Sequence, residues 1–498
     1  MSFITFLMGT VINFFLTPYI VKNLGAEAYG FVGLSNTIIS YTGLITISLN
    51  AMAGRFIALS YNKGHIEKAN RYYSSVFYSN IFLALINTII FVCIIIHLET
   101  LINIPTNLIW DIKVLFGLLA LTNILSLMTG IYGIATYIKN RLELSSIRTI
   151  VSQVLRAIVL IISFGFFAPH VWYIGLSGVF CTYYVFQTNK ILANKLTPDL
   201  KVRISYFDIT SVKKLLSSGV WNLVVKVGDL LANGIDLLFA NLFIGAEAMG
   251  VYSLTKTLPL MTQSFIGSIS SVFGPMMLQI YASGNICELE NEFHKSIRII
   301  GFFSAVPLSI LYVLGEEFYI LWLPEQNAHW LYILTIVATS SMVIWLPMEA
   351  LWQIFTLQNK VRYASMAVLA NNGLTFLMVL FAMLFVSNAD MRLLILAGTK
   401  NTLKFILSLT FLPITVASCL KTKRATFYKP IMRVVGCFIL ICIIGFIFKS
   451  FISIENWFVL LMYAVVLGLI SCIVNYFAML KTNDRVFIVA KLFRKIKG

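Results

Sequence analysis

Long apolar runs, separated by short polar segments, recur along the whole 498-residue chain. A run of about 18 apolar residues or more can cross a hydrocarbon core of roughly 30 Å as a helix. The pattern predicts an all-α polytopic membrane protein of about fourteen transmembrane helices. They are expected at residues 3–21, 28–60, 75–97, 112–137, 149–168, 171–190, 215–241, 246–282, 297–315, 330–357, 363–386, 392–416, 431–453 and 457–479.

The loops between these helices are short, and their charges alternate from one loop to the next. An even number of spans places both termini on one side, and basic loops mark the cytoplasmic side of a membrane protein. We therefore expect a multi-pass protein of the inner (cytoplasmic) membrane with both termini inside. The basic segments are Lys63 to Arg71, Lys139 to Arg148, Lys190 to Lys214, Lys295 to Arg298, Lys360 to Arg362, Lys421 to Arg433 and Lys481 to Lys497.

The composition also indicates that most of the folded chain lies in lipid. Hydrophobic residues make up 59% of the chain and charged residues only 11%, and the mean hydropathy is +0.89. The net charge of +17 is that of the basic loops, so it does not indicate a nucleic-acid partner. The seven cysteines have no paired spacing, which predicts small apolar side chains rather than metal ligands or disulfides.

The beginning and the loops of the chain hold no recognisable processing signal or domain. Met1 leads directly into an apolar stretch without a basic leader or a small-residue cleavage site, so we expect a first helix and no removable signal peptide. No loop exceeds about 30 residues, which is below the size of an independent domain. Any site must therefore be built from helices.

An internal repeat is visible at a separation of 220 residues. The segment Gly25-Ala26-Glu27-Ala28-Tyr29-Gly30 returns as Gly245-Ala246-Glu247-Ala248-Met249-Gly250. The match then continues in register to the pairs Gly64/Gly284 and Ile66/Ile286. The separation spans six expected helices, so both copies run in the same direction through the membrane, as parallel repeats do.

The repeat predicts the domain organisation. Residues 1–205 and 206–425 are expected to form two six-helix lobes, and residues 426–498 two additional helices and a basic cytoplasmic tail. Two homologous bundles around a central cavity are typical of proteins that alternate between inward-open and outward-open states. This organisation favours transport.

The chain resembles the multidrug/oligosaccharidyl-lipid/polysaccharide exporter superfamily, in particular its flippases for O-antigen and other polysaccharide repeat units. The resemblance covers nearly the whole chain and rests on Pro18-Tyr19-Ile20, Leu24-Gly25 and Tyr29-Gly30, on the second copy at Gly245 and Gly250, and on the count of six plus six plus two helices. It implies a MATE-like fold and the transfer of an undecaprenyl-diphosphate-linked oligosaccharide between membrane leaflets. It also implies a polymerase and chain-length proteins of the same pathway as partners.

These flippases usually have a short polar segment before the first helix. Met1-Ser2 leaves no room for it here, so a gating role of such a segment is not expected from this sequence.

Charged side chains within apolar helices are the best candidates for a site, because burying a charge in the membrane is costly. Residues Asn222, Lys226, Asp229, Asn233 and Asp236 recur every three or four positions and predict a polar stripe along one helix. Lys226 and Asp229 can form an ion pair on that helix, so the stripe is either a structural pair or part of a cavity lining with ion coupling.

Three further lysines are candidate ligands of a diphosphate. Lys400 and Lys404 lie one turn apart on the same face, so they repel each other unless an anion or a carboxylate stands opposite. Lys256 lies about 15 Å into its helix by helical rise. The structural alternatives are a paired role for Lys400 and Lys404 and an interfacial position for Lys256.

Arg55, Arg156 and Glu349 complete the set of candidates. The two arginines lie nearer the cytoplasmic helix ends, where they either recognise a headgroup or anchor the helix at the interface. Glu349 is an isolated intramembrane acid, so it is either a protonation site or the partner of a lysine. With Asp229 and Asp236 it is a candidate for coupling to a proton or sodium gradient.

The expected cations outnumber the carboxylates, which favours an anionic diphosphate over a cationic drug. The chain has no G-x-x-x-x-G-K-[ST] phosphate loop and no H-E-x-x-H motif, so we expect no enzyme activity, no cofactor and no metal. Two alternatives remain open. One is a drug/cation antiporter of the same superfamily, and the other is a membrane glycan polymerase or lipid-linked glycosyltransferase.

Overall fold

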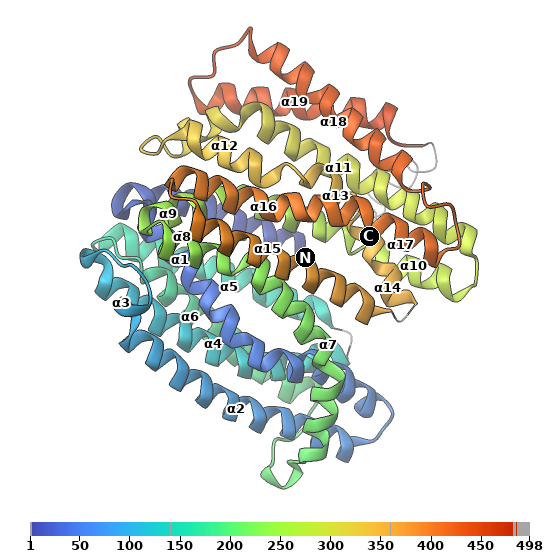
Figure 1. Ribbon diagram of the computed structural model, residues 1–498. Helices are drawn as coiled ribbons and strands as arrows, with labels where there is room; N and C mark the ends of the chain where they lie inside the picture. The colour runs from blue at the N-terminus through green and yellow to red at the C-terminus, as the bar shows by residue number, and fades with distance from the viewer. Residues whose placement is uncertain (1, 140, 359, 482–484, 486–498) are drawn as a thin grey trace. The chain divides into compact units, whose positions relative to one another are not determined.

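The computed structural model describes residues 2–139, 141–358, 360–481 and 485, with the backbone alone at residues 2–7, 42, 45, 47, 48, 51, 142, 221, 222, 225, 229, 232 and 233. Within these residues it contains helices and no strand (Figure 1), so the all-α expectation is confirmed. Ten of the helical segments are long and apolar enough to cross a membrane. The protein is a multi-pass membrane protein, and the number of fourteen spans stays a prediction.

The chain divides into two compact units. The N-terminal unit consists of Met1–Leu254 and Val368–Met383, and the C-terminal unit of Thr255–Ala367 and Leu384–Gly498. This division rests on proximity in space and does not test the expected lobes 1–205, 206–425 and 426–498, which stay a prediction.

The N-terminal unit is a bundle in which α4 packs against α1, α2 and α6 (Figure 1). Its buried core near one end includes Leu49, Ile57, Val76 and Leu215. The elements are α1 (Ser2–Asn62), α2 (Ile66–Ile96), α3 (Leu98–Leu101), η1 (Thr106–Leu108), α4 (Ile109–Ile138), α5 (Leu142–Phe166), α6 (Tyr173–Leu196), η2 (Ile204–Tyr206), α7 (Ile209–Asn233), α8 (Ile235–Phe243), the first part of α9 (Ala246–Ser270) and the middle of α15 (Val361–Phe385).

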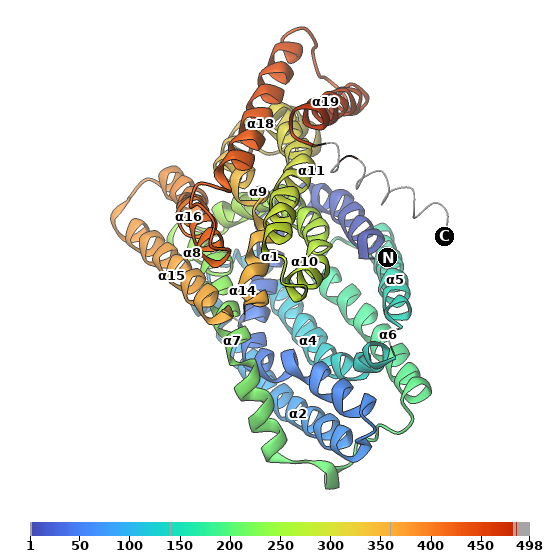
Figure 2. The same cartoon turned by 90° about the vertical axis from the view of Figure 1, so that its right-hand side faces the viewer.

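The C-terminal unit is built around α11, which packs against α18 and α19 (Figure 2) and against α12 (Figure 1). In the most apolar stretch of α11, 67% of the residues are buried, which is the largest share among the ten spans. Helix α11 is therefore the central helix of this unit. The remaining elements are α10 (Phe273–Ala282), α11 (Ile286–Trp322), α12 (Ala328–Thr339), α13 (Met342–Trp345), η3 (Glu349–Trp352), α14 (Gln353–Leu357), α16 (Ala389–Thr410), α17 (Leu412–Cys419), α18 (Tyr428–Lys449) and α19 (Trp457–Ala478).

Several expected helices are interrupted. The expected span 330–357 is divided into α12, α13, η3 and α14, and Pro347 lies at one of the breaks. Proline has no backbone N–H and its ring clashes with the preceding turn, so a helix does not continue through it without a distortion. The expected spans 3–21 and 28–60 correspond to two helices within α1 that meet at a kink at Gly25, where φ is +86°.

Four glycines of the sequence repeat have positive φ. Gly64 and Gly284 have nearly equal φ, at 79° and 78°, whereas Gly25 and Gly245 have φ of 86° and 143°. Glycine adopts this region without the strain that a side chain brings, and the same turn is formed at Gly64 and Gly284. The wider symmetry between the two copies stays a prediction.

The copies also meet directly within the N-terminal unit. A Cβ atom built on Gly30 would lie 2.9 Å from the Cα atom of Gly250, so the backbones of α1 and α9 are in contact at this point. Small residues allow two membrane helices to approach this closely.

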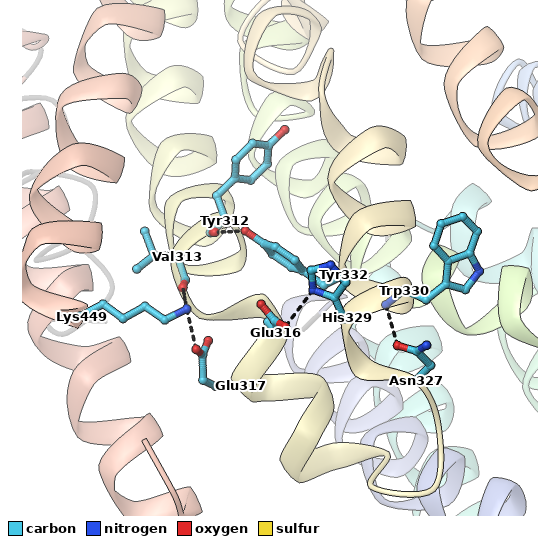
Figure 3. Close-up of polar contacts among 9 residues, drawn as sticks. All are labelled: Tyr312, Val313, Glu316, Glu317, Asn327, His329, Trp330, Tyr332 and Lys449. Carbon is cyan, nitrogen blue, oxygen red and sulfur yellow. Dashed lines mark hydrogen bonds and ion pairs between the residues drawn. The ribbon is translucent and has the colours of Figure 1, made fainter. Parts of the chain in front are cut away.

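A polar cluster joins α11, α12 and α18 in the C-terminal unit (Figure 3). The Lys449 ammonium pairs with Glu317 and donates to the backbone carbonyl of Val313 at 2.9 Å. The Tyr332 hydroxyl donates to the carbonyl of Tyr312 at 2.6 Å. The Lys449 contacts fix the end of α18, the first of the two C-terminal helices, against α11, and the Tyr332 contact fixes α12 against α11.

The N-terminus of α7 is closed by Asp208, which gives a first testable expectation. Its carboxylate accepts from the backbone N–H groups of Thr210 and Ser211, both at 3.0 Å. Hydrogen bonds from the hydroxyls of Ser211 and Thr210 are the main reason that the pKa of Asp208 is lowered to about 2. Asp208→Ala should destabilise the first turn of α7 by about 1 kcal/mol at neutral pH, measured as faster amide exchange at Thr210 and Ser211.

The pH dependence of this effect has a defined sign. The pKa is lower in the folded state than the ordinary value of about 3.9, so the stabilisation is complete above about pH 4 and is lost as the pH falls toward 2. Asp208→Asn keeps an accepting oxygen and should retain most of the cap. Equal exchange in wild type and Asp208→Ala at pH 7 would contradict the capping role.

Candidate functional site

The structure places the predicted site residues in both units. Arg55 on α1, Arg156 on α5, Lys226 and Asp229 on α7 and Asp236 on α8 belong to the N-terminal unit. The other four, Lys256 on α9, Glu349 on η3, and Lys400 and Lys404 on α16, belong to the C-terminal unit.

The predicted polar stripe of 222–236 is divided between two helices. Helix α7 ends at Asn233, Gly234 forms a turn, and Asp236 lies in the first turn of α8. The expectation of one continuous helix is therefore wrong. A Cβ atom on Gly234 would lie 2.9 Å from the carbonyl oxygen of Leu230 and 2.9 Å from the Tyr41 ring, so the close packing of this turn needs a glycine.

Lys226 has an exposed side chain, whereas Asp236 is buried. The Asp236 carboxylate accepts from the Tyr252 hydroxyl at 3.2 Å and from the backbone N–H of Leu237 at 2.8 Å. The side chains of Asn222, Asp229 and Asn233 lie outside the described part of the structure, so the predicted pair of Lys226 with Asp229 stays a prediction.

Lys404 contacts an aromatic ring in the C-terminal unit. Its ammonium lies 3.2 Å from the centroid of the Trp345 ring on α13, an arrangement in which the ring face attracts the cation. One turn earlier on α16 lies Lys400, which is half-buried. Between them Asn401 accepts from the Ser341 hydroxyl at 3.1 Å, so α16 is joined to the α12–α13 break by polar contacts.

Lys256 and Glu349 are both half-buried. Glu349 was expected on a continuous helix, but it lies at the start of the short turn η3, two residues after Pro347. Arg55 has an exposed side chain, so it is accessible at the surface of the N-terminal unit.

A cavity of about 650 Å³, lined by both polar and apolar side chains, lies within the N-terminal unit. Side chains from α1, α4, α5 and α6 line it, and Ser253 of α9 adds to the wall. Arg156 is the one charged residue among the lining residues. Of the nine predicted site residues, Arg156 is the one that lines this cavity.

The other polar residues of the wall were not singled out from the sequence. Serine, threonine, asparagine and glutamine occur on many membrane helices, so their types alone gave no signal. The spacing of Thr149, Ser152, Gln153 and Arg156 at three or four residues could have indicated a polar face on α5. The polar wall consists of Asn13, Thr17, Tyr29, Asn36, Thr122, Ser126, Thr129, Thr149, Ser152, Gln153, Cys181, Thr182 and Ser253.

Within the described residues no group of three or more His, Cys, Asp or Glu side chains is placed to hold a metal ion. All seven cysteines are free. The N-terminal cavity offers one cation, Arg156, and neutral hydrogen-bonding groups. Such groups can bind an anionic or hydroxyl-rich ligand.

The chain is similar to known proteins both in sequence and in fold. A family model described as "Polysaccharide biosynthesis protein" matches residues 23–326. The chain is 27% identical over 497 residues to the "Uncharacterized membrane protein EpsK" of Bacillus subtilis (strain 168). The alignment covers 99% of this chain and 97% of the relative.

Two solved structures share the fold. An inward-facing multidrug resistance MATE family transporter matches with a TM-score of 0.65 at 12% identity, over 84% of this chain and 96% of its own. The lipid II flippase MurJ in an inward closed conformation matches with a TM-score of 0.63 at 13% identity, over 94% of this chain and 97% of its own. At this level of identity the likeness shows the fold.

Proposed function

Because the chain belongs to the polysaccharide biosynthesis protein family, we propose that it is a flippase that moves an undecaprenyl-diphosphate-linked oligosaccharide across the cytoplasmic membrane. The observation that carries the proposal is the combination of this family with a transporter fold over most of the chain. A glycan assembled on the inner leaflet needs such a protein, because its sugars cannot cross a hydrocarbon core unaided.

The proposed mechanism is alternating access. Four lysines, Lys226, Lys256, Lys400 and Lys404, hold the diphosphate through charge-assisted hydrogen bonds. Arg55 contributes to recognition of the headgroup, and Arg156 contributes to binding of the anionic cargo. The polyprenyl tail stays in lipid, and a proton or sodium gradient acting through Asp229, Asp236 or Glu349 supplies the driving force.

A transport assay tests the role of the lysines. Lys226→Ala, Lys256→Ala and Lys400→Ala should each lower the surface polysaccharide made in a flippase-deficient strain. Loss of one charged hydrogen bond weakens binding by about 1.5 kcal/mol, or roughly tenfold. The exposed Lys423→Ala is the control, because its side chain lies in a loop outside the spans.

The same strains distinguish the alternatives. Normal polysaccharide in all three variants, at wild-type abundance, would contradict the proposed diphosphate site. Drug resistance on overexpression without any change in surface glycan would favour a drug/cation antiporter. Polymerisation of sugars by the purified chain would favour a glycan polymerase or lipid-linked glycosyltransferase.

A further inference from the structure

Arg156 brings a positive charge to the N-terminal cavity. In the described part of the chain, no hydrogen bond or ion pair joins its guanidinium to another residue. None of the residues that line the cavity with it is an aspartate or a glutamate. A guanidinium on a membrane-spanning helix is costly to bury without an anion, so a cavity with this composition is suited to an anionic ligand.

The hydroxyls of the cavity wall act mainly as acceptors toward a ligand. Thr122 and Thr129 donate their hydroxyl protons to carbonyl oxygens of their own helix, at 2.9 Å and 2.8 Å. Ser152 does the same toward the carbonyl of Thr149 at 2.8 Å. Each of these oxygens keeps lone pairs, so the wall can accept hydrogen bonds that a ligand donates.

Two amides add to this acceptor character. Asn36 donates its Nδ2 proton to the carbonyl of Val32 at 2.9 Å, which leaves its Oδ1 atom available as an acceptor. The Oε1 atom of Gln153 is buried and has no hydrogen-bond partner in the described residues. A buried acceptor without a donor is unfavourable, and a bound ligand with a hydroxyl can satisfy it.

A ligand that fits this wall must donate several hydrogen bonds and carry a negatively charged group. A sugar has hydroxyl donors around its ring, and the anionic group can be a carboxylate or a phosphate ester. We propose that this cavity is a subsite for an anionic sugar, held by Arg156 through its charge and by the hydroxyl and amide oxygens through its hydroxyls. The inference rests on the proposed function and adds that one sugar of the cargo binds inside the N-terminal unit.

The size and the charge of the cavity support this choice of ligand. About 650 Å³ falls within the usual range of small-molecule pockets, about 300 to 1,000 Å³. A cationic ligand is disfavoured, because Arg156 would repel it and no carboxylate in the wall would attract it.

Binding to the purified full-length protein in detergent tests the proposal. The probes are glucuronic acid, glucose 1-phosphate, glucose and inorganic phosphate, each titrated while thermal unfolding is followed. Glucuronic acid or glucose 1-phosphate should raise the Tm of the wild type and bind at least tenfold more tightly than glucose or inorganic phosphate. Tighter binding of glucuronic acid would identify the anionic group of the ligand as a carboxylate, and tighter binding of glucose 1-phosphate would identify it as a phosphate.

Three variants test whether the sugars bind in this cavity. Arg156→Gln removes the charge, and Gln153→Glu places a carboxylate at i,i+3 from Arg156, where it can pair with the guanidinium. Both should weaken the binding of the anionic sugars at least tenfold, and by a larger factor than they weaken the binding of glucose. Arg148→Gln is the matched control on α5, because Arg148 donates to the carbonyl of Leu144 at 2.9 Å and does not line the cavity.

Equal binding of the anionic sugars to wild type and Arg156→Gln would overturn the proposal, and so would inorganic phosphate binding as tightly as glucose 1-phosphate. These results are independent of transport. If the sugars bind as expected but the chain moves no lipid-linked oligosaccharide in reconstituted vesicles, the subsite stands and the proposed function fails. If transport is present and the binding differences are absent, the proposed function stands and the subsite fails.

Discussion

Gly250→Ala is expected to prevent normal folding of the N-terminal unit. A Cβ atom at this position would lie 2.8 Å from the backbone nitrogen of Glu27 and closer still to the carbonyl group of Ala26. The obstacle is backbone, so it cannot move aside as a flexible side chain would. Overpacking of this kind costs about 1–3 kcal/mol or more, and we expect a large loss of folded protein in size-exclusion profiles and a lower Tm.

Gly267→Ala is the matched control for this prediction. Gly267 lies on the same helix, α9, and a Cβ atom built on it has no neighbour within 4 Å. An alanine there should be neutral or slightly stabilising, because alanine is favoured over glycine inside a helix. If Gly250→Ala folds as well as Gly267→Ala, the close contact of α1 with α9 is not present in the protein.

Lys449→Met is expected to have the second largest effect. The Lys449 and Glu317 side chains are only 24% and 17% exposed, and they pair with each other. Removing the lysine leaves a mostly buried carboxylate without its cation, which costs about 3 kcal/mol. The thermal unfolding of the purified protein should show a clear drop in Tm.

The partner variant should be less damaging. Glu317→Gln keeps an acceptor for Lys449, and the lysine also keeps its hydrogen bond to the carbonyl of Val313. We therefore expect a smaller drop in Tm for Glu317→Gln than for Lys449→Met. Arg71→Met serves as the control, because Arg71 and Glu67 form an exposed pair, with 54% and 70% of the side chains accessible, worth about 0.2–1 kcal/mol. An equal drop in all three variants would contradict the special role of the buried pair.

The sequence determined that the protein is built from membrane helices and has a MATE-like fold. Apolar runs long enough to cross a bilayer, short loops and the Gly25 and Gly245 segments were sufficient for this, and the family match over 23–326 and the fold confirm it. Local chemistry predicts such features directly, because a residue's tolerance for lipid or for positive φ does not depend on distant residues.

Helix breaks were less predictable. The interruption near Pro347 could have been expected from the proline, but the turn at Gly234 that separates Asp236 from α7 could not. Glycine within a helix is tolerated at modest cost, so its presence alone predicts no turn, and the Tyr41 ring packed against Gly234 is distant in the sequence.

Only the tertiary structure decided what each charged residue contacts. Arg156 lines a cavity without a carboxylate, Lys404 lies over the Trp345 ring, and Lys449 pairs with Glu317. In lipid, the apolar faces of a helix are equally soluble whether they meet acyl chains or another helix, so hydrophobic pattern does not reveal which faces meet. The position of a charge along a helix is a property of the sequence, whereas its partner is set by how the helices pack.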